Sequence, residues 1–161
     1  MRTAALCADD PGAVFYDFSA AFPSVCHEFL VRRLRAVGIP SSVANLVCCL
    51  YWGDGCRLSV GGACHMGFRV RAGIRQGCPL SPLLFAVVVD PLPRKLRREH
   101  DSAEFRAYAD DIASVMTSLR RALPNLLQCF GRFADTSSVR LNMAKVVIIP
   151  LGDLDADALG T

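Results

Sequence analysis

Three aspartates in this 161-residue sequence stand where charged side chains are unexpected. Asp110 and Asp111 are adjacent in FRAYADDIASVM, a run that predicts two apolar strands meeting at the two acids. Asp17 falls at the end of a short aromatic strand, AVFYDF. Adjacent like charges repel and raise each other's pKa unless a cation offsets them, so the pair favours a metal site. A solvated surface turn is the alternative for the pair alone, because acids are common in turns.

Three such carboxylates can hold two Mg²⁺ ions, since Mg²⁺ binds a few carboxylate oxygens and fills its remaining positions with water and substrate phosphate. Two ions about 3.5 to 4 Å apart can clamp the attacking and leaving oxygens of a phosphoryl transfer. We therefore expect Asp17, Asp110 and Asp111 to converge in the fold, although they are far apart in the sequence.

The elements that must position these acids mix helices with strands joined by hairpins, which predicts an α+β domain whose antiparallel sheet is covered on one face. Ser24 is a plausible N-cap for a helix that ends at Gly38. Ser41 or Ser42 is a plausible N-cap for a second helix. Gly61 and Gly62 suit the turn of a β-ribbon. A third helix is expected to begin at residue 81, and the prolines at 91 and 93 should kink or end it. A fourth helix is expected over 118–135, before a final pair of strands.

The apolar positions of the second helix, at i, i+3, i+4 and i+7 spacing, predict which of its faces is buried. These positions are Val43, Leu46, Val47 and Leu50. The corresponding face of the 118–135 helix is expected to carry its leucines and Phe130. The first two helices, which begin near Ser24 and near Ser41, are interpreted as scaffold.

The composition is that of one packed domain. With 52% hydrophobic and 20% charged residues, the chain is not disordered, collagen-like or a coiled coil. The longest apolar run is too short to span a membrane, and MRTAALCADD does not read as a secretory signal. We therefore expect an intracellular protein, cytoplasmic or nuclear, with no membrane partner. The eight cysteines show no C-x-x-C pair and no zinc spacing, so free thiols are expected.

The charge of the chain is unevenly distributed. Its net charge is +3, and because the C-terminal segment is acidic, residues 1–150 carry a net charge of +6. Lys95 and Lys145 are the only lysines, so the positive charge is mostly arginine, whose guanidinium group suits bidentate phosphate contacts. Codon bias acting on a solvated surface is the alternative explanation. The charge thus permits a nucleic-acid partner without establishing one.

Four motifs, FYDFSAAF, GIRQGCPLSPLLF, AYADDI and LNMAK, occur in this order and resemble the palm of a reverse transcriptase of the non-LTR retrotransposon and group II intron type. The likeness covers residues 13–152, between a short extension at 1–12 and an acidic tail at 153–161. It implies a ferredoxin-like (RRM-like) palm with RNA-directed DNA polymerase activity. Its implied partners are an RNA template, a DNA primer and deoxynucleoside triphosphates.

The resemblance also implies roles for individual residues. Asp17 would bind both metal ions with help from the backbone carbonyl of Phe18, and Asp110 with Asp111 would complete the site. The ions would be Mg²⁺, for which Mn²⁺ can substitute. Lys145 matches a lysine that protonates the pyrophosphate leaving group, although a lone lysine near a strand is usually a surface residue.

Other residues match the part of the family that contacts substrate. Phe22 matches an aromatic steric gate that leaves no room for a 2′ hydroxyl, with a core aromatic as the alternative. Gln76 and Gly77 match a loop that touches the incoming nucleotide and the template. Arg75 could reach a phosphate or simply be solvated, and Tyr108 precedes the aspartates as the family expects.

The sequence also departs from the family pattern. Pro23 stands where many relatives carry an acid or an amide, so the local turn can differ. Only sixteen residues precede Asp17 and few follow LNMAK, so the fingers and thumb are expected to be largely missing and the isolated chain inactive. A catalytically inactive retroelement remnant, acting at most as a scaffold or nucleic-acid-binding module, is one alternative. An RRM-like binder is another, but it predicts stacking aromatics where this chain has acids.

Overall fold

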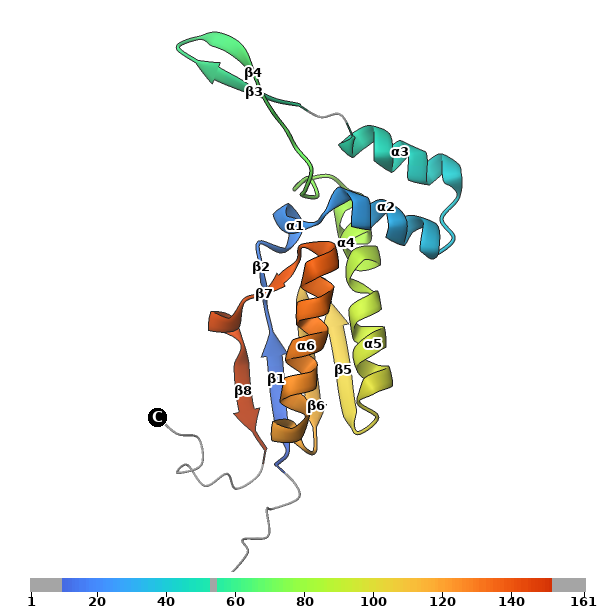
Figure 1. Cartoon of the computed structure of the whole chain (residues 1–161), viewed down its shortest axis with the longest axis vertical. Helices are drawn as coiled ribbons and strands as arrows, with labels where there is room; N and C mark the ends of the chain where they lie inside the picture. Colours follow the sequence, from blue (N-terminus) through green and yellow to red (C-terminus); the bar gives the residue numbers. More distant parts are fainter. Residues whose placement is uncertain (1–9, 53–54, 152–161) are drawn as a thin grey trace, which may run out of the picture.

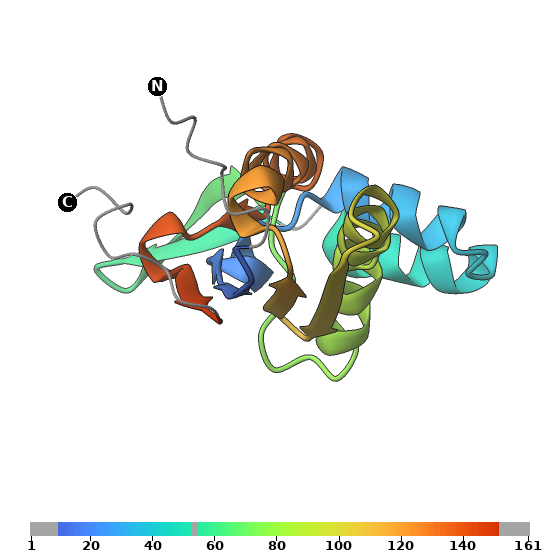
Figure 2. The same ribbon diagram turned by 90° about the horizontal axis from the view of Figure 1, so that it is seen from below.

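The computed structural model describes residues 10–52 and 55–151, and its centre is an antiparallel four-stranded sheet with the order β5-β6-β1-β8 (Figure 1). Helices α5 and α6 lie along one face of this sheet (Figures 1 and 2). The sheet and its helices are β1 (Gly12–Tyr16), α4 (Ser81–Val89), α5 (Pro91–Glu99), β5 (Ala103–Tyr108), β6 (Asp111–Met116), α6 (Leu119–Ser137) and β8 (Val147–Pro150). This mixed α and β arrangement with an antiparallel sheet agrees with the prediction.

The two faces of the sheet differ in burial. Along β1, Val14 and Tyr16 are buried beneath the helices, whereas Phe15 between them is 47% exposed on the opposite face. The same alternation runs along β6, where Ile112 is buried and Val115 is half-exposed. Side chains that alternate with the core residues therefore face away from the helices. We call this side of the sheet the open face.

The segment between β1 and α4 forms a second layer of helices and a hairpin. The hairpin extends away from the rest of the molecule (Figure 1), and its turn at Gly61 and Gly62 has φ values of 59° and 83°, as a primed turn requires. The predicted β-ribbon is therefore confirmed. The elements are β2 (Phe18–Ser19), α1 (Ala21–Ser24), α2 (His27–Ala36), α3 (Ser41–Tyr51), β3 (Gly55–Val60) and β4 (Ala63–Arg69).

The predicted start of the first long helix is wrong. Ser24 ends α1 and donates a hydrogen bond to the Ser19 carbonyl at 3.4 Å, and α2 begins only at His27. The intervening Val25 is held in extended backbone because its carbonyl accepts a hydrogen bond from the Gly73 N–H at 2.8 Å. A tertiary contact thus replaces the expected cap.

The predicted buried face of α3 is also partly wrong. Val47 is buried as expected, but Val43 and Leu46 are 45% and 53% exposed, and Ala44 and Tyr51 are buried in their place. The helix is capped by Pro40 and not by the side chain of Ser41 or Ser42. Packing of Tyr51 against His27 of α2, with ring centroids 5.2 Å apart, turns this face of the helix inward.

The C-terminal strands pair with different partners and not with each other. β7 (Arg140–Leu141) pairs with β2, whereas β8 pairs with β1 after the short 3₁₀ helix η1 (Met143–Lys145). The acidic tail and most of the expected N-terminal extension lie outside the described residues. Within the described part, seven cysteines are all free thiols, and no helix has the length and apolarity that a membrane span requires.

Candidate active site

Asp17 lies at the junction where the chain leaves the main sheet. It follows β1 and precedes β2, and its neighbours Tyr16 and Phe18 are both buried in the core. The Phe18 ring packs between Phe130 and Phe133 of α6, so this residue can offer only its backbone to a ligand. Because side chains alternate along an extended chain, the Asp17 side chain is directed away from this core, and it is 29% exposed.

Asp111 begins the neighbouring strand β6 at the end of the sheet where the chain leaves β1 at Asp17. Tyr16 of β1 is paired with Ile112 of β6, so the following residue of one strand meets the preceding residue of the other at the same end of the sheet. Asp111 alternates with buried Ile112 as Asp17 alternates with buried Tyr16, which places both acids on the open face. A hollow of about 620 Å³ on this face is lined by Phe15, Tyr16, Asp111 and five other residues of β1, β5 and β6.

Two strands meet at the aspartates as predicted, but the turn between them lies one residue earlier than expected. β5 ends at Tyr108 and β6 begins at Asp111, so Ala109 and Asp110 form the turn. Ala109 has a φ of 52°, in the left-handed region that residues with a Cβ seldom adopt. Tyr108 is 85% exposed and Asp110 is half-buried. A backbone outlier of this kind is often found at functional sites.

Two side chains from the LNMAK segment contact the Asp17 carboxylate. The Nζ of Lys145 lies 3.3 Å from Asp17 Oδ2, and the Nδ2 of Asn142 donates to the same oxygen at 3.4 Å. The Asn142 backbone N–H also donates to the Asp17 carbonyl at 2.8 Å. Sequence reasoning had missed Asn142; its only signal was its place in the same motif as Lys145. The LNMAK segment and the first aspartate thus belong to one site.

The oxygen atoms of this site are suitable ligands for a hard cation, but the acidic side chains do not form a cluster that could coordinate one. Among residues 10–52 and 55–151, no three acidic, histidine or cysteine side chains lie close enough together to hold a metal ion. The Asp17 carboxylate is paired with the Lys145 ammonium. Carboxylate oxygens and a backbone carbonyl are nevertheless the ligands that Mg²⁺ prefers. The residues present therefore fit the ion in kind.

The burial of Phe22 lies between what a steric gate and what a core residue would show. Its ring stacks on the fully buried Phe85 of α4, with centroids 4.7 Å apart, and it is itself half-buried. The Phe22 carbonyl accepts a hydrogen bond from the Ile74 N–H at 2.8 Å, which holds the loop before α4 beside Phe22. In this loop Gln76 and Gly77 are exposed, and Gly77 has a φ of 84° with open space around it.

Arg75, in the same loop, is directed toward α3. Its guanidinium carbon lies 5.8 Å from the centroid of the Tyr51 ring, and its backbone N–H donates to the Tyr51 hydroxyl at 3.4 Å. Its side chain is exposed at the loop surface.

Comparison with known proteins shows the family to which this chain belongs. Residues 4–153 match the family described as reverse transcriptase (RNA-dependent DNA polymerase). The chain belongs to the reverse transcriptase family. Similar proteins include the Pol polyprotein of the type-1 retrotransposable element R2 from Popillia japonica, 29% identical over 144 residues, and that of the type-2 element R2DM from Drosophila melanogaster, 33% identical over 135 residues. These likenesses assign the reverse transcriptase domain to the non-LTR retrotransposon type.

The match covers most of this chain but a small part of its relatives. It spans 84% of the chain and 24% of the Popillia polyprotein, and 80% of the chain and 13% of the Drosophila one. Among solved structures, telomerase from Candida tropicalis in complex with a fragment of telomeric RNA aligns with a TM-score of 0.73 at 10% identity, covering 90% of this chain and 26% of that one. This reverse transcriptase domain therefore shares its fold with part of telomerase.

Proposed function

We propose that this domain is the palm of an RNA-directed DNA polymerase that adds deoxynucleotides to the 3′ hydroxyl of a primer on an RNA template. The observation that carries the proposal is the placement of Asp17 beside Asp111 on the open face, next to the turn that holds Asp110. The strand order β5-β6-β1-β8 with α6 between β6 and β8 supports a ferredoxin-like palm.

Asp17, Asp110 and Asp111, with the Phe18 carbonyl, would hold two Mg²⁺ ions, or Mn²⁺ in their place. When bound, such ions favour the alkoxide of the primer 3′ hydroxyl and offset charge on the departing pyrophosphate. The carboxylates supply the negative charge that binds the ions, and their place at strand ends fixes their backbone positions. Lys145 would donate a proton to the pyrophosphate leaving group. Its 3.3 Å contact with Asp17 supports this role, because it places the ammonium group at the site.

Substrate selection would fall to the residues around Phe22. The Phe22 ring has little freedom to move because Phe85 stacks on it, and a ring held in this way can exclude a 2′ hydroxyl. Gln76 and Gly77 would contact the incoming nucleotide and the template, since Gly77 lets the backbone approach closely. Arg75 would reach a phosphate, and exposed Tyr108 would border the primer beside the acids.

Further segments of a longer polyprotein would supply the fingers and thumb. An exposed apolar edge supports this part of the proposal, because Val147, Ile148 and Ile149 of β8 are 51%, 45% and 44% exposed on an outer strand. Contiguous exposed apolar surface of this kind marks an interface. Template and primer would then be gripped by those segments while the palm supplies the chemistry.

The proposal is tested by grafting residues 13–152 into an active R2 polymerase in place of its matching segment. The chimera should extend a DNA primer on an RNA template, and Asp17→Asn or Asp111→Asn should reduce the rate by about a thousandfold, the scale on which loss of a charge-stabilising group acts. Asp101→Asn, an exposed acid in the turn before β5, is the matched control and should retain activity. A folded chimera without primer extension would identify an inactive remnant.

A further inference from the structure

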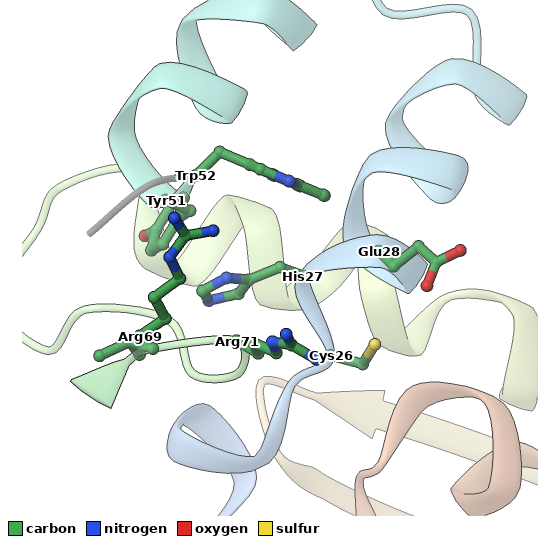
Figure 3. A pocket seen from close by; sticks show the side chains of 8 residues that line it. Cys26, His27, Glu28, Tyr51, Trp52, Arg69 and Arg71 are labelled. Carbon is green, nitrogen blue, oxygen red and sulfur yellow. The ribbon is translucent and has the colours of Figure 1, made fainter. Parts of the chain in front are cut away.

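A second cavity lies away from the aspartates, where the start of α2, the end of α3 and the residues after β4 meet (Figure 3). Its volume is about 450 Å³, within the range of small-ligand sites. None of its lining residues lines the hollow on the open face. The lining residues that carry the argument are His27, Glu28, Trp52, Arg69 and Arg71.

The floor of this cavity is built by backbone pairing between segments far apart in the sequence. Cys26 and Ala72 form an antiparallel bridge, and the His27 N–H donates to the Arg71 carbonyl at 3.3 Å. The buried His27 ring adds a hydrogen bond from Nε2 to the Gly73 carbonyl at 2.8 Å. These contacts therefore fix the backbone position of Arg71 at the floor of the cavity.

An exposed aromatic side chain forms one wall. Trp52 follows the last residue of α3 and is 52% exposed, and its ring centroid lies 6.2 Å from that of His27 (Figure 3). Tyr51 beside it is buried, with its ring tilted against that of His27, so the exposed Trp52 ring is the one that a ligand can reach. Nucleobases stack on exposed rings of this kind in proteins that bind single strands.

The charge at this wall is positive. Arg69 and Arg71 are exposed, and neither forms an ion pair with another described residue. Among the described residues that line the cavity, the one acid is Glu28, which pairs with Arg32 at 2.7 Å and points away from the ring cluster (Figure 3). Two guanidinium groups beside an exposed indole suit a phosphate next to a base. A site for a simple anion would not require the exposed ring, and an apolar ligand would not require the arginines.

We propose that this cavity binds one nucleotide of a single-stranded nucleic acid, with its base on Trp52 and its phosphate between Arg69 and Arg71. The site would anchor a strand outside the reaction centre. Its binding chemistry does not use the carboxylates, so it should operate without divalent metal.

The direct test uses the fluorescence of Trp52, which is the only tryptophan of the chain. The full chain is titrated in EDTA with an octamer of uridylate, an octamer of thymidylate, or polyphosphate of matched charge. The oligonucleotides should quench the emission with saturation, because a stacked base quenches indole, whereas polyphosphate should leave it unchanged. Tighter binding of uridylate assigns the site to an RNA strand and tighter binding of thymidylate to a DNA strand, and either supports the cavity.

Variants separate this site from general electrostatic attraction. The double change Arg69→Gln with Arg71→Gln should weaken binding and make the slope of log affinity against log salt shallower by about 0.7, as expected when one phosphate of a single strand is no longer neutralised. The control double change Arg98→Gln with Arg121→Gln removes the same charge from exposed positions on α5 and α6 and should change both quantities less. Circular dichroism checks that each variant is folded.

The aromatic contact has its own pair of variants, followed by the anisotropy of a labelled octamer. Trp52→Ala should weaken binding by about tenfold or more, and Trp52→Phe should keep most of the affinity, because loss of one stacked base costs roughly 1 to 3 kcal/mol. Asp17→Asn should bind normally, so a failure of the catalytic proposal would not affect this one. Quenching by polyphosphate, equal effects of both arginine pairs, or no saturable binding would each overturn the assignment.

Discussion

The ammonium group of Lys145 lies 3.3 Å from the Asp17 carboxylate and acts as its counter-ion. Their exposed fractions, 68% and 29%, show that water screens the contact, so its energy is small. Any cation that binds Asp17 must nevertheless compete with this ammonium. The pair thus links the LNMAK segment to the first acid electrostatically as well as through the backbone.

Removal of the ammonium should therefore strengthen divalent cation binding. Lys145→Met should lower the dissociation constant for Mn²⁺ by about threefold, the scale of a screened ion pair. Asp17→Asn should weaken binding strongly, because a proposed ligand is lost. Mn²⁺ titration followed by electron paramagnetic resonance measures both. Lys95→Met is the matched control: its partner Glu99, 3.6 Å away, lies on α5, and Mn²⁺ affinity should not change. Unchanged affinity in Lys145→Met would contradict the competition.

The turn at Ala109 should carry a cost in stability that glycine relieves. Ala109 has a φ of 52°, so Ala109→Gly should raise the free energy of unfolding by about 1 kcal/mol. Ala107→Gly, two residues earlier in β5, should have the opposite sign and lower it by about 0.5 to 1 kcal/mol. Urea denaturation measures both. Destabilisation by both changes would show that the Ala109 methyl group makes a contact worth more than the strain.

The strands and the hairpin were predictable because their signals are local. The short aromatic and β-branched run of β1 and the Gly61–Gly62 pair indicate their structures from adjacent residues. The start of α2 was not predictable in this way, since Val25 is held extended by Gly73, a partner far along the chain. Apolar residues lie on two sides of α3, so its sequence does not specify which side is buried. The packing of Tyr51 against His27 determines this.

The sequence singles out the acids of the candidate site but gives little information on their surroundings. Asp17 and Asp111 stand out because a charge interrupts an apolar strand, and each is adjacent in sequence to a member of the Tyr16–Ile112 pair that ends the register. Asn142 has no such signal, since an amide outside regular structure is common, and its contacts depend on how β7 meets β2. Arg69 and Arg71 reach the cavity beside Trp52 because the segment after β4 pairs with residues 25–27, through contacts that the sequence does not indicate.

Phe22 should prove to be both a packing residue and a gate. Because its ring is half-buried on Phe85, Phe22→Ala should cost about 1 to 3 kcal/mol of unfolding free energy, less than a fully buried phenylalanine. In the grafted polymerase the same change should increase ribonucleotide incorporation relative to deoxynucleotide. Phe85→Ala, the control, should cost about 3 to 5 kcal/mol, since that ring is fully buried. Unaltered sugar selectivity in Phe22→Ala would leave only the packing role.

Cys129 should resist alkylation and make stability depend on alkaline pH. Burial, and then its hydrogen bond to Glu99, raise the pKa of the thiol to about 11. Because the folded pKa exceeds the unfolded value, the thiol contributes stability that is present below about pH 8.5 and is lost as pH rises through about 11. The stability advantage of wild type over Cys129→Ala, measured by urea denaturation, should therefore shrink over this range, whereas Cys49→Ala, at an exposed thiol, should track wild type. Iodoacetamide at pH 8.5 should label Cys49 and Cys64 before Cys129, and equal labelling would show that the thiol is accessible and ionised.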